Sequence, residues 1–392
     1  MTPADSGRPC RPLAWAIVGS TATIALVLAG CTSDDGDSST SSTSSSTLPT
    51  PDVTTIGSGD VVELATAFAD TLDDDQKEAL YQDYTFANAS DWSNLPNSFL
   101  GGSGGGGGTV GGDASTGTTS TTSSRVGLQT DSLSDEQWQA LYALLAAATG
   151  SGDGEGFDEI YQHLLADDYL DENGGGDSYG HGNFFIAFLG EPSDSGTWEL
   201  QFGGHHLAVS NTYTDGALAG ATPSFRGIEP FTTTEVDGVE LQAEQQEQAA
   251  FAALLQSFDE DQLSEAKLDE TFGDVLLGPG SDWAFPDSYE GIKGSELSDD
   301  QQALLLAAIN TYVDDVDDAD AATILAEYES ELDDTYVAYT GSTEVSSTDD
   351  YVRIDGPSVW IEFSEQDGVV LSGTHPHAVW RDKQSDYGGS TS

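Results

Sequence analysis

Apolar residues in several long stretches of this chain recur three and four positions apart, which is the spacing of one face of an α-helix. Val61, Leu64 and Phe68 show this pattern at the start of the first stretch, and Asp73 stands where the cap of the next helix is expected. The pattern predicts helices over residues 61–72, 74–84, 134–148, 157–168, 243–256, 298–313 and 320–331.

Other stretches are shorter and have the apolar, β-branched and aromatic composition of strands. Asp215-Gly216, between two of them, has the composition of a tight hairpin turn. Because groups of strands alternate with groups of helices, we predict a single α+β domain over residues 59–390, with an antiparallel sheet packed against several helices. The predicted strands cover residues 183–189, 197–202, 206–213, 217–221, 336–339, 351–354, 359–363 and 377–380.

One short phrase opens two of the predicted helices. Leu133-Ser134-Asp135-Glu136-Gln137 recurs as Leu297-Ser298-Asp299-Asp300-Gln301, and Phe258–Gln262 is a looser copy. A serine followed three residues later by a glutamine fits a capping box, in which each side chain binds the backbone N–H of the other residue. Because the copies are unequally spaced, this repeated cap chemistry does not by itself establish a structural repeat.

Two segments lack the apolar residues that a packed core requires. Residues 31–58 are rich in Ser, Thr and Asp, and we expect a disordered tether there. Residues 101–124 are rich in glycine and then in Ser and Thr. Because the roughly 45 residues before this second segment are few for an independent domain, we expect a disordered insertion within one domain.

The N-terminus has the composition of a secretory signal. Two arginines precede an apolar run, Leu13 to Leu28, that is too short to span a bilayer. Leu28-Ala29-Gly30-Cys31 then fits a lipobox, so we expect residues 1–30 to be removed and Cys31 to carry lipid. Such lipid anchors a protein to a membrane without spanning it, and the expected location is extracytoplasmic. The alternative is an ordinary signal peptide with an incidental cysteine.

The chain is strongly acidic, with 69 acidic and 10 basic residues and a formal net charge of −59. A compact state with this charge repels itself unless salt screens it, and the screening length falls to about 3 Å at 1 M salt. We therefore expect a high-salt organism such as a halophilic archaeon, with a specific cation-binding surface as the alternative. Nucleic acid is excluded as a partner because phosphate binding requires a basic face.

The number of cysteines limits which disulfides and metal sites the chain can form. Removal of residues 1–30 would leave Cys31 as the only cysteine. The mature chain would then have neither an intramolecular disulfide nor a cysteine metal site, so its fold must be held by its core.

Four of the six histidines fall in two close pairs. His205 and His206 follow two glycines, and His375 and His377 flank a proline. In an extended segment, His375 and His377 point to the same side of the strand. His205 and His206 point to opposite sides, so only one of these two can join His375 and His377. Three imidazoles with an open position suit zinc, copper or iron. The alternative is that these are structural, hydrogen-bonded histidines.

Charged residues near the histidine pairs and in the strands are candidates for supporting roles. Asp382, Asp386 and Glu362 can be carboxylate ligands or can orient a histidine ring. A chain with so few basic residues is expected to keep arginines where a planar guanidinium binds a buried carboxylate or an anion. The candidates for holding a small anionic ligand are Arg226, Arg353 and Arg381, with structural ion pairs as the alternative.

Aromatic residues in and near the predicted strands have two interpretations. They can line a pocket for an apolar or sugar-like ligand, or they can be ordinary core residues. The residues concerned are Trp198, Phe202, Phe225, Trp283, Trp360 and Trp380.

Several short phrases, spread over residues 85–388, match those of one known family. They are Trp92–Pro96, Leu133–Gln137, Phe184–Ser193, Trp198–His206, Thr222–Gly227, Tyr351–Phe363, His375–Asp382 and Asp386–Gly388. In this combination the chain resembles the domain-of-unknown-function family 3500. The resemblance implies that both histidine pairs and the three candidate arginines belong to the family's signature phrases. It implies no activity, because the family has none assigned.

The sequence as a whole predicts a lipid-anchored, extracytoplasmic α+β protein. The leading functional hypothesis is a transition-metal site, made by His205 or His206 with His375 and His377, that binds or acts on a small anionic ligand. The residues do not distinguish hydrolysis, redox chemistry and simple binding. The alternatives are a metal-free solute-binding or interaction module with an aromatic-lined cleft, and a structural surface protein.

Overall fold

The computed structural model describes residues 47–52, 54, 59–100, 125–232 and 234–390. The expected signal peptide, the expected lipidation site at Cys31 and the expected insertion at 101–124 lie outside the described residues. Within the described ranges, no helix combines the length and the apolar composition that a membrane span requires.

Most of the longer helices begin after a side chain that accepts a backbone N–H of the first turn, as N-caps do. Asp60 accepts from the backbone N–H of Glu63 at 3.1 Å, for example. The helices are α1 (Val61–Asp70), α2 (Asp74–Leu80), α3 (Phe86–Ala89), α4 (Asn97–Leu100), α5 (Asp135–Ala148), α6 (Gly156–Leu170), α7 (Gln245–Gln256), α8 (Glu260–Ala266), α9 (Asp299–Val313) and α10 (Asp318–Glu331).

The strands of the described residues form a 12-stranded sheet and a separate two-stranded hairpin, β8–β9. They are β1 (Tyr81–Gln82), β2 (Leu128–Gln129), β3 (Phe185–Leu189), β4 (Thr197–Gly204), β5 (Leu207–Thr214), β6 (Ala217–Gly220), β7 (Ser224–Gly227), β8 (Thr234–Val236), β9 (Val239–Leu241), β10 (Ile292–Lys293), β11 (Tyr336–Thr340), β12 (Tyr351–Asp355), β13 (Val359–Asp367) and β14 (Thr374–Asp382).

The order of strands in the large sheet is β1-β3-β4-β5-β7-β14-β13-β12-β11-β10, with β2 on β3 and β6 on β5. Every pair is antiparallel except β1 with β3, which is parallel. Strand β7 pairs with both β5 and β14, so it joins the strands around β4 to those around β13. This arrangement confirms the predicted α+β fold with an antiparallel sheet.

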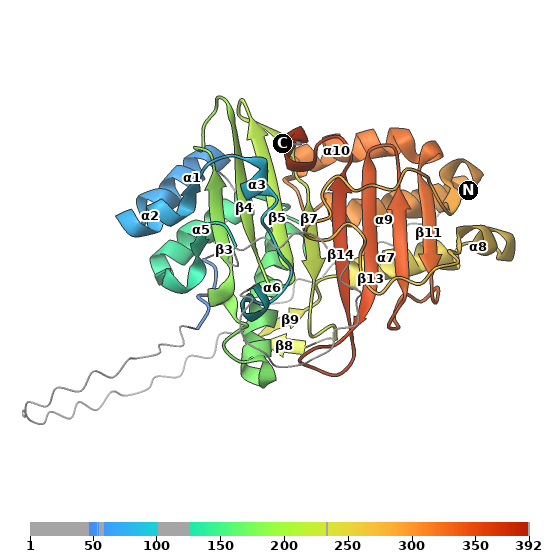
Figure 1. Cartoon of the computed structure of the whole chain (residues 1–392), viewed down its shortest axis with the longest axis horizontal. Coiled ribbons are helices and arrows are strands. Elements are labelled where there is room, and N and C mark those ends of the chain that lie inside the picture. Colours follow the sequence, from blue (N-terminus) through green and yellow to red (C-terminus); the bar gives the residue numbers. More distant parts are fainter. Residues whose placement is uncertain (1–46, 53, 55–58, 101–124, 233, 391–392) are drawn as a thin grey trace, which may run out of the picture. The chain divides into compact units, whose positions relative to one another are not determined.

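The two faces of the sheet are covered differently. The longer helices pack on one face, where α5 and α6 cover β3–β5 and α7 and α9 cover β11–β14. In Figure 1 these helices lie behind the sheet, and the segment that carries α3 crosses its front. A smaller cluster on the front face includes Trp92, Phe225, Val379 and Tyr387. Irregular segments, rather than helices, therefore cover the front of the sheet.

The described structure begins inside the range that was expected to be a tether. Leu48 is buried with the residues of α5 in the larger core. The hydroxyl of Tyr142 donates to the carbonyl of Pro49 at 2.9 Å, and the side chain of Gln139 donates to the carbonyl of Thr50 at 3.0 Å. Residues 47–50 therefore pack against α5 as part of the domain.

The cap phrases belong to two similar helix arrangements. Gln76 of α2 and Gln137 of α5 face each other with their side-chain amides, and Gln137 donates to Gln76 at 2.8 Å. Gln262 of α8 and Gln301 of α9 form the matching pair, with Gln301 donating at 2.8 Å. Each of the four helices starts with a complete capping box. The sequence showed only repeated caps, and the packing shows that each pair of caps holds two helices together.

Candidate metal centre

His205 and His206 form the two-residue turn between β4 and β5, because Gly204 is the last residue of β4 to pair and its partner is Leu207. Residues in such a turn do not alternate between the faces of a sheet. The two rings stack on each other with their centroids 3.7 Å apart, contrary to the expectation that they point to opposite sides. His206 has a φ of 60°, in the left-handed region, and this conformation helps to set the direction of its ring.

His375 and His377 lie on β14 and project from the same face of the strand, as alternation in a strand requires. His377 stands opposite Gly227 of β7. A Cβ atom at Gly227 would lie 2.8 Å from the carbonyl oxygen of Pro376 and 3.2 Å from the ring of His377. Glycine at this position therefore leaves the space that the histidine rings occupy.

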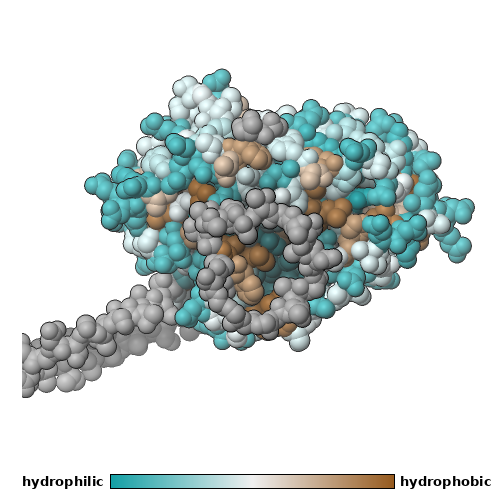
Figure 2. Space-filling view, viewed as in Figure 1, coloured by the Kyte–Doolittle hydropathy of each residue, from teal (hydrophilic) through white to brown (hydrophobic). Residues whose placement is uncertain are grey.

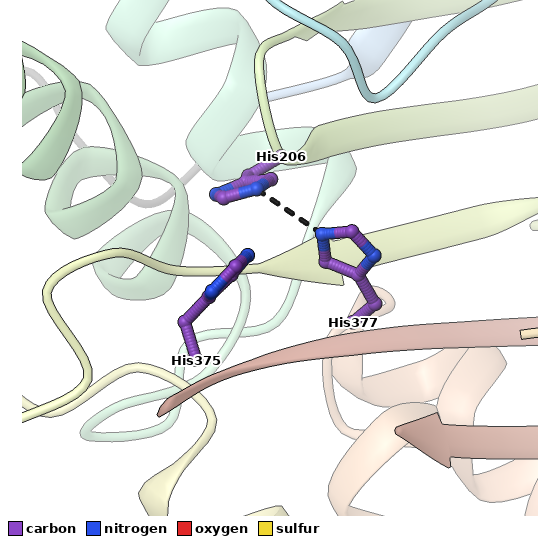
Figure 3. Close-up of side chains that lie close together, drawn as sticks. All are labelled: His206, His375 and His377. Atoms are coloured by element: carbon purple, nitrogen blue, oxygen red, sulfur yellow. Dashed lines mark hydrogen bonds between the residues drawn. The ribbon is translucent and has the colours of Figure 1, made fainter. Parts of the chain in front are cut away.

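The structure brings His206, His375 and His377 together, and one ligand atom from each lies within 4.8 Å of the others. The ring centroid of His206 is 5.0 Å from that of His375 and 5.1 Å from that of His377. The Nε2 atoms of His206 and His377 are 3.2 Å apart (Figure 3). Nδ1 of His375 is buried and has no hydrogen-bond partner among the described residues. We call these three residues the histidine cluster.

Two carboxylates orient the imidazoles in and beside the histidine cluster. Nδ1 of His377 lies 2.9 Å from Asp274 in the segment between α8 and β10. Nδ1 of His205 lies 2.6 Å from the buried carboxylate of Asp167 on α6. Such contacts fix which ring nitrogen carries the proton, and they leave Nε2 of His377 turned toward His206.

Burial keeps two of the three imidazoles neutral. Burial, together with smaller contributions from the neighbouring His377 and His205, lowers the pKa of His375 to about 2. Burial also lowers the pKa of His206 well below its usual value, and the four histidines around it, His205, His375, His377 and His163, act in the same direction. A neutral imidazole has a free lone pair, which is the form that binds a metal ion.

The three carboxylates predicted near the histidines have partners elsewhere. Asp382 accepts from the hydroxyl of Tyr328 at 2.7 Å, and Asp386 pairs with Arg381 at 3.0 Å. Asp382 follows His377 by five residues on an extended strand, which separates the two by about 16 Å. Glu362 is closer in the sheet, opposite Val379. Its carboxylate accepts from the side chains of Tyr351 and Trp360 and from the backbone of Leu276 and Leu277.

The three candidate anion-binding arginines each contact carboxylates. Arg226 lies 2.8 Å from Glu159 and 3.0 Å from Asp315. Arg353 lies 3.0 Å from Glu290. Arg381 pairs with Asp282 and Asp386 and also donates to the carbonyl of Leu277. These contacts match the structural ion pairs considered as the alternative, so we leave the arginines out of the proposed site.

The candidate aromatic residues are mostly core. Trp198, Phe202, Phe225, Trp360 and Trp380 are all buried, and they are spread over both faces of the sheet. A cavity of about 170 Å³ lies between β6 and α10, and Trp380 is the one member of the set in its lining. These residues do not gather into one aromatic-lined cleft.

Sequence reasoning missed Asp274 and Asp167. Asp274 lies in a segment without apolar periodicity, far from the histidines along the chain. Asp167 lies in a helix that was predicted, at four-residue spacing from Glu159 and His163, which places all three on one face. That spacing was the only signal in the sequence that Asp167 shares a helix face with other polar residues. The packing of α6 beside the β4–β5 turn shows that this face contacts His205.

The fold and the histidine cluster define the class: an α+β protein whose central sheet carries a group of three histidines. A family model described as "Protein of unknown function (DUF3500)" matches residues 117–389. The chain belongs to this family, as its signature phrases indicated. No curated protein and no solved structure matched the chain.

Proposed function

We propose that this protein is an extracytoplasmic, lipid-anchored metal-binding protein. His206, His375 and His377 hold one transition-metal ion, which is zinc, copper or iron, and the ion's remaining position receives a small anionic ligand. The convergence of three imidazoles from two distant segments is the observation that carries this proposal.

The separation between ring nitrogens fits a pair of metal ligands. Two nitrogens that bind one tetrahedral ion at 2.0–2.1 Å lie about 3.3 Å apart. The Nε2 atoms of His206 and His377 are 3.2 Å apart. Without an ion, one of these nitrogens must donate a proton to the other, and His375 keeps an unpaired buried nitrogen.

The contact with Asp274 supports the same assignment. Metal-binding histidines usually donate their second ring N–H to a carboxylate or carbonyl, which fixes the tautomer and increases the basicity of the ligand. His377 makes such a contact at 2.9 Å. His377 and the half-exposed Asp274 also form the more accessible edge of the site, from which a ligand can approach.

A bound ion would supply a positive charge in a very acidic protein. Three protein nitrogens leave at least one coordination position for water or an anion, where the ion can lower the pKa of water or polarise a bound group. The chain's own residues hold the ion, fix its ligands and restrict access. The contacts do not favour one reaction over another, so we assign binding and no reaction.

Metal analysis of the purified protein tests the proposal. After removal of metals with a chelator and addition of Zn²⁺, Cu²⁺ or Fe²⁺ in turn, we expect about one tightly bound ion per chain. His375→Asn and His206→Asn should abolish that binding; asparagine tolerates the left-handed conformation of residue 206. His181→Asn is the control, because His181 is equally buried but pairs with Asp168 outside the histidine cluster.

A second variant tests the role of Asp274. Asp274→Asn should weaken metal binding by about 10–100-fold, since it removes the carboxylate that orients His377. The exposed Asp269 of the same segment provides the matched control, Asp269→Asn. Substoichiometric metal in the folded wild-type protein would overturn the metal proposal and would leave the solute-binding and structural alternatives.

The lipid anchor is tested separately. If Cys31 carries lipid, the protein expressed in a lipoprotein-processing host should partition into the detergent phase, and Cys31→Ser should move it to the aqueous phase. Cys10→Ser is the matched control, because Cys10 lies in the segment expected to be removed. Aqueous partitioning of the wild-type protein would contradict the anchor without affecting the metal proposal.

A further inference from the structure

A second buried cluster of ligand groups lies apart from the histidines. One carboxylate oxygen from each of Glu159, Glu244 and Glu247 lies within 4.8 Å of the others, and all three residues are buried. Glu159 comes from α6, Glu244 immediately precedes α7, and Glu247 lies in its first turn. We call these three residues the glutamate cluster.

One arginine balances part of this negative charge. Arg226 donates through Nε to Glu159 at 2.8 Å and to Asp315, just after α9, at 3.1 Å. Arg226 therefore supplies one positive charge beside the four carboxylates of Glu159, Glu244, Glu247 and Asp315, and it contacts two of them. Burying several carboxylates with one positive charge is expensive unless protons or another cation neutralise the remainder.

Several buried polar atoms in and near this cluster are unpaired. Both carboxylate oxygens of Glu244 and Oε2 of Glu247 are buried without a hydrogen-bond partner in the described parts of the chain. The hydroxyl of Tyr312 on α9 is likewise buried and unpaired. Burial, followed by the charges of Glu244, Glu247 and Glu159, raises the pKa of Tyr312, so its hydroxyl lies within reach of their field.

The backbone at Glu244 is also unusual. Its φ of 64° places a non-glycine residue in the left-handed region, and its side chain does not cap α7. Its backbone N–H instead donates to Glu159 at 3.3 Å. A strained conformation of this kind persists where surrounding contacts hold it, and it is common at ligand sites.

We propose that Glu159, Glu244 and Glu247, with the hydroxyl of Tyr312, form a binding site for one hard divalent cation, best satisfied by Ca²⁺. Carboxylate and hydroxyl oxygens are the donors that such ions prefer, and Ca²⁺ accepts irregular sets of six to eight oxygens. Glu244 can offer both of its oxygens. Mg²⁺ usually retains several waters, which a fully buried cluster accommodates poorly.

Protons compete with the cation for the same oxygens. Burial raises the pKa of Glu244 to about 8, although Arg226 opposes the change. Burial also raises the pKa values of Glu159 and Glu247, and the neighbouring carboxylates raise them further. Without a cation, the cluster must therefore hold protons near neutral pH.

The position of the cluster indicates what the cation does. Its residues come from α6, α7 and α9, so they connect the helices that cover β3–β5 with those that cover β11–β14. A cation bound only in the folded state would fasten these helices together and raise the stability of the domain by mass action. This role does not depend on a metal at the histidine cluster.

Calcium binding to chelator-treated full-length protein tests the proposal. Measurements in 1 M KCl suppress diffuse binding to the acidic surface, since the screening length is then about 3 Å. We expect about one retained Ca²⁺ per chain and a rise in Tm of roughly 4 °C at a Ca²⁺ concentration 100 times its Kd. Mg²⁺ at the same concentration should give a smaller shift.

Variants separate the site from the acidic surface. Glu244→Gln and Glu247→Gln keep side-chain size but remove charge, and each should eliminate the retained Ca²⁺ and its Tm shift while the fold persists by circular dichroism. The exposed Glu240 supplies the control, Glu240→Gln, which should bind Ca²⁺ as the wild type does. Absence of bound Ca²⁺ in the wild type, or equal binding by all variants, would overturn the proposal.

Discussion

His206 illustrates how much of the candidate centre depends on single residues. Its positive φ and the missing Cβ of Gly227 together allow its ring to approach those of β14. The neighbouring His205 is held by Asp167, and its ring stacks on the ring of His206. At the residue scale, therefore, the centre is built from one unusual backbone conformation, one glycine and two carboxylates that orient rings.

Glu199 is a second residue with an unusual environment. It lies on β4, fully buried, and accepts from the hydroxyl of Thr212 at 3.2 Å and from Gln201 at 3.4 Å. Burial raises its pKa to about 8. The folded protein therefore keeps a proton that the unfolded chain releases near pH 4.5. The contribution of Glu199 to the free energy of unfolding is therefore complete below about pH 4.5 and is lost as the pH rises through about 8.

Glu199→Gln should flatten the dependence of stability on pH. Glutamine keeps the shape and cannot ionise, so the variant should avoid roughly 4 kcal/mol of the loss in unfolding free energy between pH 4.5 and 9. Urea unfolding at several pH values measures this, with the exposed Glu191→Gln as the control. Parallel pH profiles for wild type and Glu199→Gln would show that Glu199 is already ionised in the folded protein.

At the element scale, α6 connects the two candidate cation sites. Glu159, His163 and Asp167 follow one another at four-residue spacing and so share one face of the helix. Glu159 belongs to the glutamate cluster, and Asp167 holds His205 beside the histidine cluster. Asp167 follows Glu159 by eight positions, which corresponds to about 12 Å along the helix axis.

The glutamines of the capping boxes join helices in both halves of the domain. Gln137 donates to the carbonyl of Thr71 at 3.0 Å and to Gln76, and it also accepts from the backbone N–H of Ser134. Gln301 makes the matching contacts with Ser257, Gln262 and Ser298. Each glutamine therefore caps its own helix and fastens it to a second one, α5 to α2 and α9 to α8.

Replacing either glutamine should destabilise the protein by a similar amount. We expect Gln137→Leu and Gln301→Leu each to lower the free energy of unfolding by about 2–4 kcal/mol, because each leaves buried donors and acceptors unpaired. Controls in the same first turns are the exposed Glu136→Gln and Asp300→Asn, which should change it by less than about 0.5 kcal/mol. If only one of the two leucine variants has a lower free energy of unfolding, the α2–α5 and α8–α9 arrangements do not contribute equally to stability.

For the whole molecule, charge is the dominant property. The whole chain has a net charge of −59, and Figure 2 shows hydrophilic residues across much of the visible face. Three of the four arginines in the described part of the chain, Arg226, Arg353 and Arg381, pair with carboxylates. Little positive charge is therefore left to offset the repulsion between acidic side chains at the surface.

Stability should consequently depend on salt, as the proposed high-salt origin requires. Raising KCl from 0.1 M to 2 M should increase Tm by several degrees or more, because the screening length falls from about 10 Å to below about 3 Å. Thermal unfolding followed by circular dichroism measures this, and sucrose of equal osmolality is the control. A Tm that sucrose raises as much as KCl does would mean that charge screening is not the cause.

The main elements of the fold were predictable because their signals are local. The periodicity of α5 and α9, their serine caps and the composition of β3–β5 and β11–β13 all lie within short windows of the chain. The short strands β1, β2, β7 and β10 escaped prediction because two to four residues carry too little pattern. Their existence depends on a neighbouring strand that offers hydrogen bonds.

The sequence by itself determined the α+β class, most helices and strands, and the histidine pairs as the candidate chemistry, since residue type and spacing suffice for these. Only the tertiary structure decided that His206, rather than His205, meets His375 and His377, and that Asp274 supports His377. It alone brought Glu159 together with Glu244 and Glu247. The physical reason is that such sites join residues distant in the chain, and sheet register and helix packing determine which of them meet.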